Sequence, residues 1–184
     1  FIGNSLTEKL LEINNEVYVI SRTENSLKTR DNLHYFTCSL NQLEKLKLII
    51  EENRIELIIH LASTLVPSSN FNSFIKEFEE IITPTNHLIH YLGDKSIPLI
   101  FFSSGGTIYG NSNLLPTPES ANSNPICYYG ISKFLIERII LNEAKENGLK
   151  YLIVRPSNPY AVGQQKHKNQ GIIPRIFDAL LKNS

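Results

Sequence analysis

Tyr129 and Lys133 lie four residues apart in the segment Tyr-Gly-Ile-Ser-Lys. Apolar residues around them recur at three- and four-residue spacing, which predicts a helix over 128–146 and places both side chains on one face, one turn apart. A phenol has an ordinary pKa of about 10, but a neighbouring ammonium stabilises the phenolate and makes the phenol a usable acid or base near neutral pH. The same spacing is common on exposed helices, so the pair gains meaning only from other segments.

Small and polar residues follow three of the expected strands. The segment 103–110, Ser-Ser-Gly-Gly-Thr-Ile-Tyr-Gly, follows an apolar run, as do His-Leu-Ala-Ser at 60–63 and Arg-Pro-Ser-Asn-Pro-Tyr at 155–160. Ligands of open α/β sheets bind outside the carboxyl ends of the strands, where small residues let a flat ring approach and hydroxyls bind a reacting oxygen. For His60 itself, packing near the sheet is favoured over catalysis.

Gly3 stands at the start of the first expected helix. A glycine there lets helix and strand pack closely and leaves free N–H groups for a pyrophosphate. One glycine is not a fingerprint, and a simple turn explains it equally well.

Short β-branched runs alternate with longer amphipathic segments along the chain. This alternation predicts an α/β fold in which helices cover both faces of a parallel sheet. The stretch 110–125, rich in Asn, Ser and Pro, is long for a connection and indicates a functional loop. The expected strands are 17–21, 34–37, 57–62, 99–103 and 151–155, and the expected helices are 4–13, 42–52, 71–91, 128–146 and 172–181.

Composition bounds the class of protein. A chain of 184 residues suits one domain, and its 18 Lys+Arg balance 18 Asp+Glu without a basic run, so we expect neither nucleic acid nor a membrane as a partner. The two cysteines, without metal-ligand spacing, fit a reducing cytosol and predict a cytoplasmic protein with no metal site. Because the first residue is Phe, we expect the true start to lie upstream.

Taken together and in this order, the segments resemble the extended short-chain dehydrogenase/reductases, and within them the NAD-dependent epimerase/dehydratase group typified by UDP-glucose 4-epimerase. The resemblance spans essentially the whole chain and implies a Rossmann-like, doubly wound parallel sheet. The glycine-rich loop of the family is Gly-x-x-Gly-Phe-Ile-Gly, so Gly3 would be its last glycine. The chain would then be an NAD(P)-binding domain that lacks its first strand, between 17–21 and 57–62, and most of the C-terminal substrate region, which 171–184 would begin.

The resemblance also implies roles for single residues. Tyr129 would be the catalytic acid/base, and Lys133 would bind the nicotinamide ribose and lower the Tyr129 pKa. Asn158 would reach the substrate. The other residues expected along the cofactor are Gly3, Ala62, Ser63, Ser103, Ser104 and Pro156, with Ser157 also beside the nicotinamide.

The sequence departs from the family pattern near the expected site. Gly105 replaces the Ser or Thr that normally shares the substrate proton, so we assign the supporting role to Thr107, with Ser104 as the next choice. Related dehydratases carry an Asp-Glu pair where this chain has Gly106 and Thr107, which disfavours dehydration. Arg22 replaces the usual acidic residue that binds the adenosine ribose, so NADP is possible in place of NAD, unless Arg22 only stacks over the adenine.

The expected activity is NAD-dependent epimerisation at C4 of a nucleotide sugar, UDP-linked, through a transient 4-keto sugar. Two alternatives stay open: an NADPH-dependent nucleotide-sugar reductase, which Arg22 would favour, and a cofactor-binding protein with impaired catalysis, suggested by Gly105. The family often forms homodimers through two helices per subunit, here 71–91 and 128–146. The isolated chain is expected neither to bind dinucleotide tightly nor to turn over a nucleotide sugar.

Overall fold

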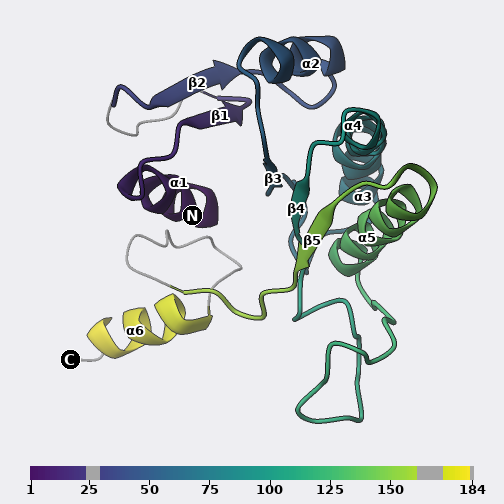
Figure 1. The fold of residues 1–184 in the computed structure, drawn as a ribbon. Helices are drawn as coiled ribbons and strands as arrows, with labels where there is room; N and C mark the ends of the chain where they lie inside the picture. Colours follow the sequence, from purple (N-terminus) through teal and green to yellow (C-terminus); the bar gives the residue numbers. More distant parts are fainter. Residues whose placement is uncertain (24–29, 161–171, 183–184) are drawn as a thin grey trace.

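The computed structural model describes residues 1–23, 30–160 and 172–182. Strands and helices alternate along the chain, which confirms the expected α/β class (Figure 1). Residue 171 and residues 183–184, part of the segment expected to begin the substrate region, lie outside the described residues. The elements are α1 (Ile2–Glu12), β1 (Val17–Ser21), β2 (Leu33–Thr37), α2 (Leu43–Glu52), β3 (Ile58–His60), α3 (Phe71–Glu77), the π-helical turn η1 (Phe78–Ile82), α4 (Thr83–Asp94), β4 (Leu99–Phe102), α5 (Tyr128–Asn147), β5 (Tyr151–Val154) and α6 (Ile172–Lys182).

The helix expected over 71–91 is three successive helical segments, α3, η1 and α4. Pro84 explains the last boundary, because it occupies the first turn of α4, where the N–H that proline lacks is not needed. Asn70 begins α3, since its side chain accepts a hydrogen bond from the Ser73 N–H.

All described strands pair in parallel, in two separate sheets. One sheet is β1-β2, with Val17 opposite Leu33. The other has the order β3-β4-β5, with Leu99 opposite both Ile58 and Tyr151. Among the described residues, no strand pairs with the free edges of β1 and β3.

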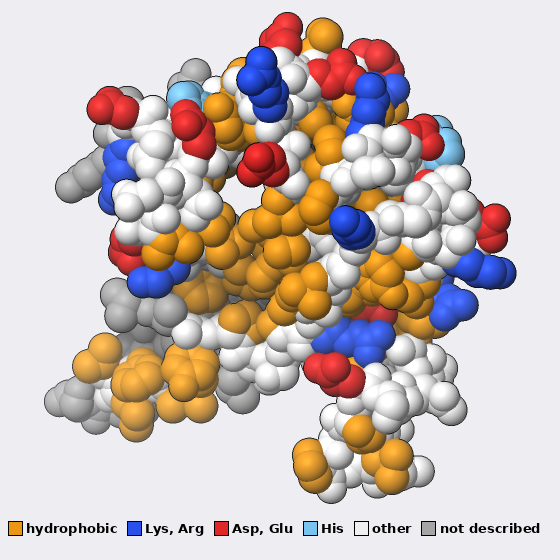
Figure 2. Space-filling model, in the orientation of Figure 1, with side chains coloured by type: hydrophobic (Ala, Val, Ile, Leu, Met, Phe, Trp, Pro, Cys, Tyr) orange, Lys and Arg blue, Asp and Glu red, His pale blue; other side chains and the backbone are white. Residues whose placement is uncertain are grey.

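A cleft of about 960 Å³ separates the two sheets. Its walls include β1, β3 and the facing sides of α1 and α2. Hydrophobic side chains gather where the molecule is hollowed in Figure 2. The cleft therefore exposes apolar surface that a closed parallel sheet would bury.

The main core lies between β3-β4-β5 and the helices α4 and α5, which cover one side of this sheet, while α1 lies on the other (Figure 1). The central strand β4 contributes Leu99 and Phe101, which are almost fully buried, and α5 contributes Ile136 and Ile140. Each such side chain stabilises the fold by about 1.5–3 kcal/mol. The core thus fixes α5 against β4.

No helix among the described residues is long and apolar enough to span a membrane.

The first turn of α5 packs closely on the loop that follows β4. A Cβ at Gly130 would lie 2.6 Å from the Thr107 carbonyl oxygen and 2.9 Å from the Pro125 Cβ. Only glycine fits this contact without movement of the loop backbone.

Gly130→Ala is therefore expected to lower the free energy of unfolding by roughly 2 kcal/mol, the usual cost of overpacking. Gly3→Ala is the matched control, because its new Cβ would meet only the Leu61 Cδ1, at an ordinary 3.6 Å. Urea unfolding followed by circular dichroism measures both. Equal stability of the two variants would show that the loop at Thr107 yields freely.

Candidate active site

The carboxyl ends of β3, β4 and β5 bring the three expected segments to one edge of the sheet. Ser103 N donates to Val154 O over 2.8 Å, and Gly105 N donates to Pro156 O over 2.9 Å. The segments after β4 and β5 therefore touch along their backbones. The structure places Ser103, Ser104 and Pro156 together, as the strand-end argument predicts.

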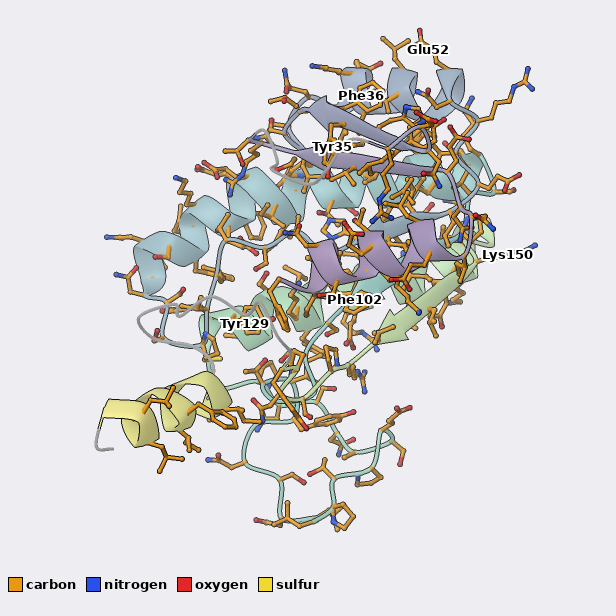
Figure 3. All side chains as sticks on the ribbon, turned by 90° about the vertical axis from the view of Figure 1, so that its left-hand side faces the viewer. Tyr35, Phe36, Glu52, Phe102, Tyr129 and Lys150 are labelled. Carbon is orange, nitrogen blue, oxygen red and sulfur yellow. The ribbon has the colours of Figure 1, made fainter. Side chains whose placement is uncertain are left out.

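Tyr129 and Lys133 belong to α5, which packs against this sheet. Tyr129 lies at the N-terminal end of the helix (Figure 3). The Lys133 Nζ lies 5.8 Å from the centroid of the Tyr129 ring and 4.9 Å from that of Phe101, and only 3% of Lys133 is exposed. The expected pair on one helix face is present.

The pKa of the Tyr129 phenol is raised, first by burial and then by the negative charges of Glu77 and Cys127, while its interaction with Ser104 lowers it. Burial lowers the pKa of the Lys133 ammonium to about 8, and Glu77 opposes that shift. Burial has the largest effect on the Tyr129 pKa, because removing the phenol from water disfavours the phenolate. The effect expected of Lys133 on that pKa stays a prediction.

Gly105 occupies a position that has no space for a side chain with a hydroxyl. A Cβ at this position would lie 2.7 Å from the Arg155 carbonyl oxygen, so no Ser or Thr fits unless the backbone moves. The Ser104 side chain acts on the phenol instead. The Thr107 Oγ1 is buried without a hydrogen-bond partner among the described residues. Ser104, the second choice from the sequence, is thus the hydroxyl that acts on the phenol, and the supporting role of Thr107 stays a prediction.

Buried polar atoms without partners gather at this edge. Among the described residues they are the His60 Nδ1, the Ser103 Oγ and the Thr107 Oγ1. Buried polar groups are nearly always hydrogen-bonded, so three of them at one sheet edge point to a polar ligand. With the small Gly106 and the cationic Lys133 nearby, they suit a flat nicotinamide and its ribose.

His60 has the packing role expected for it. Its Nε2 lies 2.9 Å from the Thr85 hydroxyl, and its ring meets the Phe101 ring edge-on at 5.7 Å. Burial lowers the pKa of His60 to about 3, with a further contribution from Lys133, so the ring is neutral near pH 7.

The remaining expected cofactor residues line the cleft between the sheets: Gly3, Arg22, Ala62 and Ser63. Tyr129 and Lys133 do not line it. Gly3 lies within the first turn of α1 rather than before the helix. The exposed Arg22 guanidinium lies 3.4 Å from the Glu80 carboxylate of η1, so it already has an anionic partner.

Arg155 holds the segment after β5 in place. Its guanidinium donates to both carboxylate oxygens of Glu137, over 3.0 and 2.7 Å, and to the Tyr109 hydroxyl over 2.7 Å. The paired Glu137 raises the Arg155 pKa, and Glu137 itself is buried. The expected substrate residue Asn158 lies three positions further on and is exposed.

The sequence analysis did not predict two buried carboxylates, those of Glu77 and Glu137. A signal was available, because each falls on the apolar side of its helix, Glu77 four residues before Ile81 and Glu137 three residues before Ile140. Within the ranges that the structure describes, no group of His, Cys, Asp and Glu could hold a metal ion.

Comparisons with known proteins agree with this geometry. Residues 1–184 match the model of the NAD dependent epimerase/dehydratase family. The crystal structure of UDP-glucose 4-epimerase from Thermotoga maritima, with UDP-glucose, superposes with a TM-score of 0.88 at 28% identity, covering 100% of this chain and 61% of that one.

Two further proteins extend the comparison. The Thermus thermophilus UDP-glucose 4-epimerase in complex with NAD has the same fold, with a TM-score of 0.85 at 24% identity, over 100% of this chain and 60% of that one. The dTDP-4-dehydro-6-deoxyglucose reductase of Escherichia coli is 32% identical over 143 residues, 77% of this chain and 45% of that protein. The chain thus spans about three-fifths of the epimerases' length. By its match along all 184 residues, the chain belongs to the NAD-dependent epimerase/dehydratase family.

Proposed function

We propose that the protein carrying this chain is an NAD-dependent nucleotide-sugar epimerase that inverts C4 of a UDP-linked sugar. The observation that carries the proposal is the arrangement of Tyr129, Lys133 and Ser104 at the edge where β4 ends. The likeness to an epimerase whose structure holds UDP-glucose supports this choice of substrate.

In this mechanism the Tyr129 oxygen takes the proton of the C4 hydroxyl, and the Ser104 hydroxyl hydrogen-bonds the same sugar oxygen. When bound, NAD would supply reversible hydride transfer at C4, through which the configuration of that carbon is inverted. Lys133 would bind the nicotinamide ribose, and Tyr129 would return the proton to the sugar oxygen. Burial raises the pKa of the phenol, so Tyr129 must first lose its own proton to solvent before its oxygen can take the proton of the C4 hydroxyl.

The proposed binding residues fall into two groups. Gly3, Arg22, Ala62 and Ser63 would bind the adenosine and pyrophosphate part of NAD along the cleft. Ser103, Ser104, Lys133 and Pro156 would surround the nicotinamide end, with Asn158 and Thr107 on the sugar side.

A reductase is the second candidate. Its support is Arg22, which suits the 2′-phosphate of NADP, and the similarity to the Escherichia coli reductase. The Arg22–Glu80 ion pair counts against it, because the Glu80 carboxylate both engages the guanidinium and repels a phosphate. The third reading, impaired catalysis, loses its main support once Ser104 supplies the hydroxyl that Gly105 lacks.

A homodimer is part of the proposal. Helices α3 and α5 pack together and leave large apolar side chains in solvent, including Phe71, 57% exposed, and Phe78 of η1, 44% exposed. Ile75 and Ile131 extend this surface. Such a patch is typical of an interface between helices.

We expect the complete protein to interconvert UDP-glucose and its C4 epimer without net change in the cofactor. Tyr129→Phe should lower the rate by about 100-fold or more while NAD affinity stays nearly unchanged, since only the ionisable oxygen is lost. Chromatography of the nucleotide sugars and calorimetry with NAD measure the two effects. Net NADPH oxidation with a 4-keto sugar would instead establish the reductase.

Ser104 and Thr107 can be separated by substitution. Ser104→Ala should slow turnover at least about tenfold, because a hydrogen bond to the reacting oxygen is lost. Thr107→Val, nearly the same shape, should weaken sugar binding but slow turnover less than Ser104→Ala, since only Ser104 acts on the phenol; the melting temperature should be unchanged or higher, since the Thr107 hydroxyl has no partner among the described residues. The opposite order would restore Thr107 to the supporting role.

Arg22→Ala distinguishes the cofactors. If Arg22 is held by Glu80, the variant should bind NAD and NADP with similar, small losses, measured by calorimetry. A loss for NADP that exceeds the loss for NAD by about tenfold, equivalent to one charge-assisted hydrogen bond, would favour NADP and the reductase.

A further inference from the structure

Glu77 is a fully buried carboxylate, with 0% of its surface exposed, at the end of α3. It lies where α3 passes into the π-helical turn η1, and both pack against α5. Such π-helical turns are rare and frequently occur at functional sites. The mechanism above gives Glu77 no part.

The hydrogen bonds of Glu77 join two distant segments. From the segment after β3, Ser63 Oγ donates to Oε1 over 2.8 Å, and Thr64 donates to Oε2 through its N–H over 2.7 Å and its hydroxyl over 2.5 Å. From α5, the Ser132 hydroxyl donates to Oε1 over 3.4 Å. Ser63 lines the cofactor cleft, and Ser132 directly precedes Lys133.

Stability alone does not call for a carboxylate here. Burying a charge costs several kcal/mol even when it is hydrogen-bonded, and well-packed apolar replacements for buried charges are often neutral or stabilising. Three hydroxyls and one amide are arranged to satisfy this single group. The energetic cost of burying the Glu77 carboxylate indicates that its negative charge has a role in the protein.

The charge acts on α5. Glu77 opposes the effect of burial on the Lys133 pKa and adds to the raised pKa of Tyr129. The other ionisable groups that act on this pair are His60 of β3, which is neutral near pH 7, and Cys127 at the start of α5. Arg155 pairs with the other buried carboxylate, Glu137 of α5.

We propose that Glu77 is a positioning residue, which ties the cofactor-binding segment after β3 to α5 and brings a buried negative charge against the helix that carries Lys133. The segment and the cation would both hold the cofactor, so one side chain fixes two of its contacts. The role in catalysis rests on the proposed function, but the contacts and the charge do not.

Glu77→Gln tests the charge, because glutamine keeps the shape and can still accept the Thr64 N–H bond. The Lys133 pKa, about 8 in the native protein, should fall by roughly one unit, as expected when a nearby opposite charge is lost. NMR of protein labelled with ¹³C-lysine measures it, with Lys133→Arg assigning the signal. NAD affinity, measured by calorimetry, should fall more at pH 8 than at pH 6.

Glu79→Gln is the matched control, because it removes the same charge from an exposed position two residues away. A merely structural Glu77 would lower the melting temperature of Glu77→Gln but leave the Lys133 pKa equal in both variants, and that result overturns the proposal. Neither the NMR titration nor NAD binding needs turnover. A wild-type protein that epimerises no sugar would thus refute the proposed function while the test of Glu77 proceeds.

If Glu77→Gln does not fold, Thr64→Val and Ser132→Ala test the link from either side. Each removes one hydroxyl donor and leaves the carboxylate in place. NAD affinity several-fold lower at an unchanged melting temperature supports the link, and unchanged affinity in both variants overturns it.

Discussion

The backbone hydrogen bond from Gly105 N to Pro156 O joins the segments that leave β4 and β5, and the candidate site depends on it. Parallel pairing of β4 with β5 brings the two chain segments to the same edge, and the bond continues their contact beyond the last ladder residues, Phe102 and Val154. The approach is so close that a side chain at Gly105 would strike the Arg155 carbonyl. Position 105 therefore cannot supply a hydroxyl, and the neighbouring Ser104 is the residue that acts on the phenol.

Buried charge organises the layer around this edge. Glu137 holds the Arg155 guanidinium, which in turn binds Tyr109 in the loop after β4. Glu77 binds the segment after β3 and acts on Lys133. Each carboxylate thus connects α5 to a different strand end. In a low-dielectric interior such links are rigid, because breaking one leaves an unpaired charge.

The cleft separates the strand-end residues of the candidate site from the β1-β2 sheet. Arg22 spans part of this distance through its ion pair with Glu80, but both side chains are partly in solvent, where such a pair contributes little stability. The β1-β2 side has its own close contacts, such as the ion pair of Arg30 with Glu8 over 2.6 Å, but its link across the cleft through Arg22 is weak.

The sequence by itself determined the α/β class, most element positions and the pairing of Tyr129 with Lys133. These are local properties: a helical period places two residues on one face, and an apolar run followed by small polar residues marks a strand end. The break of the 71–91 helix was also within reach, since Pro84 stands in the sequence.

Tertiary structure alone decided that Ser104 acts on the Tyr129 phenol and that burial raises the Tyr129 pKa. It also decided that only glycine fits at position 105 and that Arg22 pairs with Glu80. Each depends on how closely residues far apart in the chain approach and on how much water they lose. The spacing of residues along the sequence shows neither the distance between remote residues nor their loss of water. The role of Glu77 is of the same kind, because a glutamate becomes a buried charge only when two other segments, the one after β3 and α5, close around it.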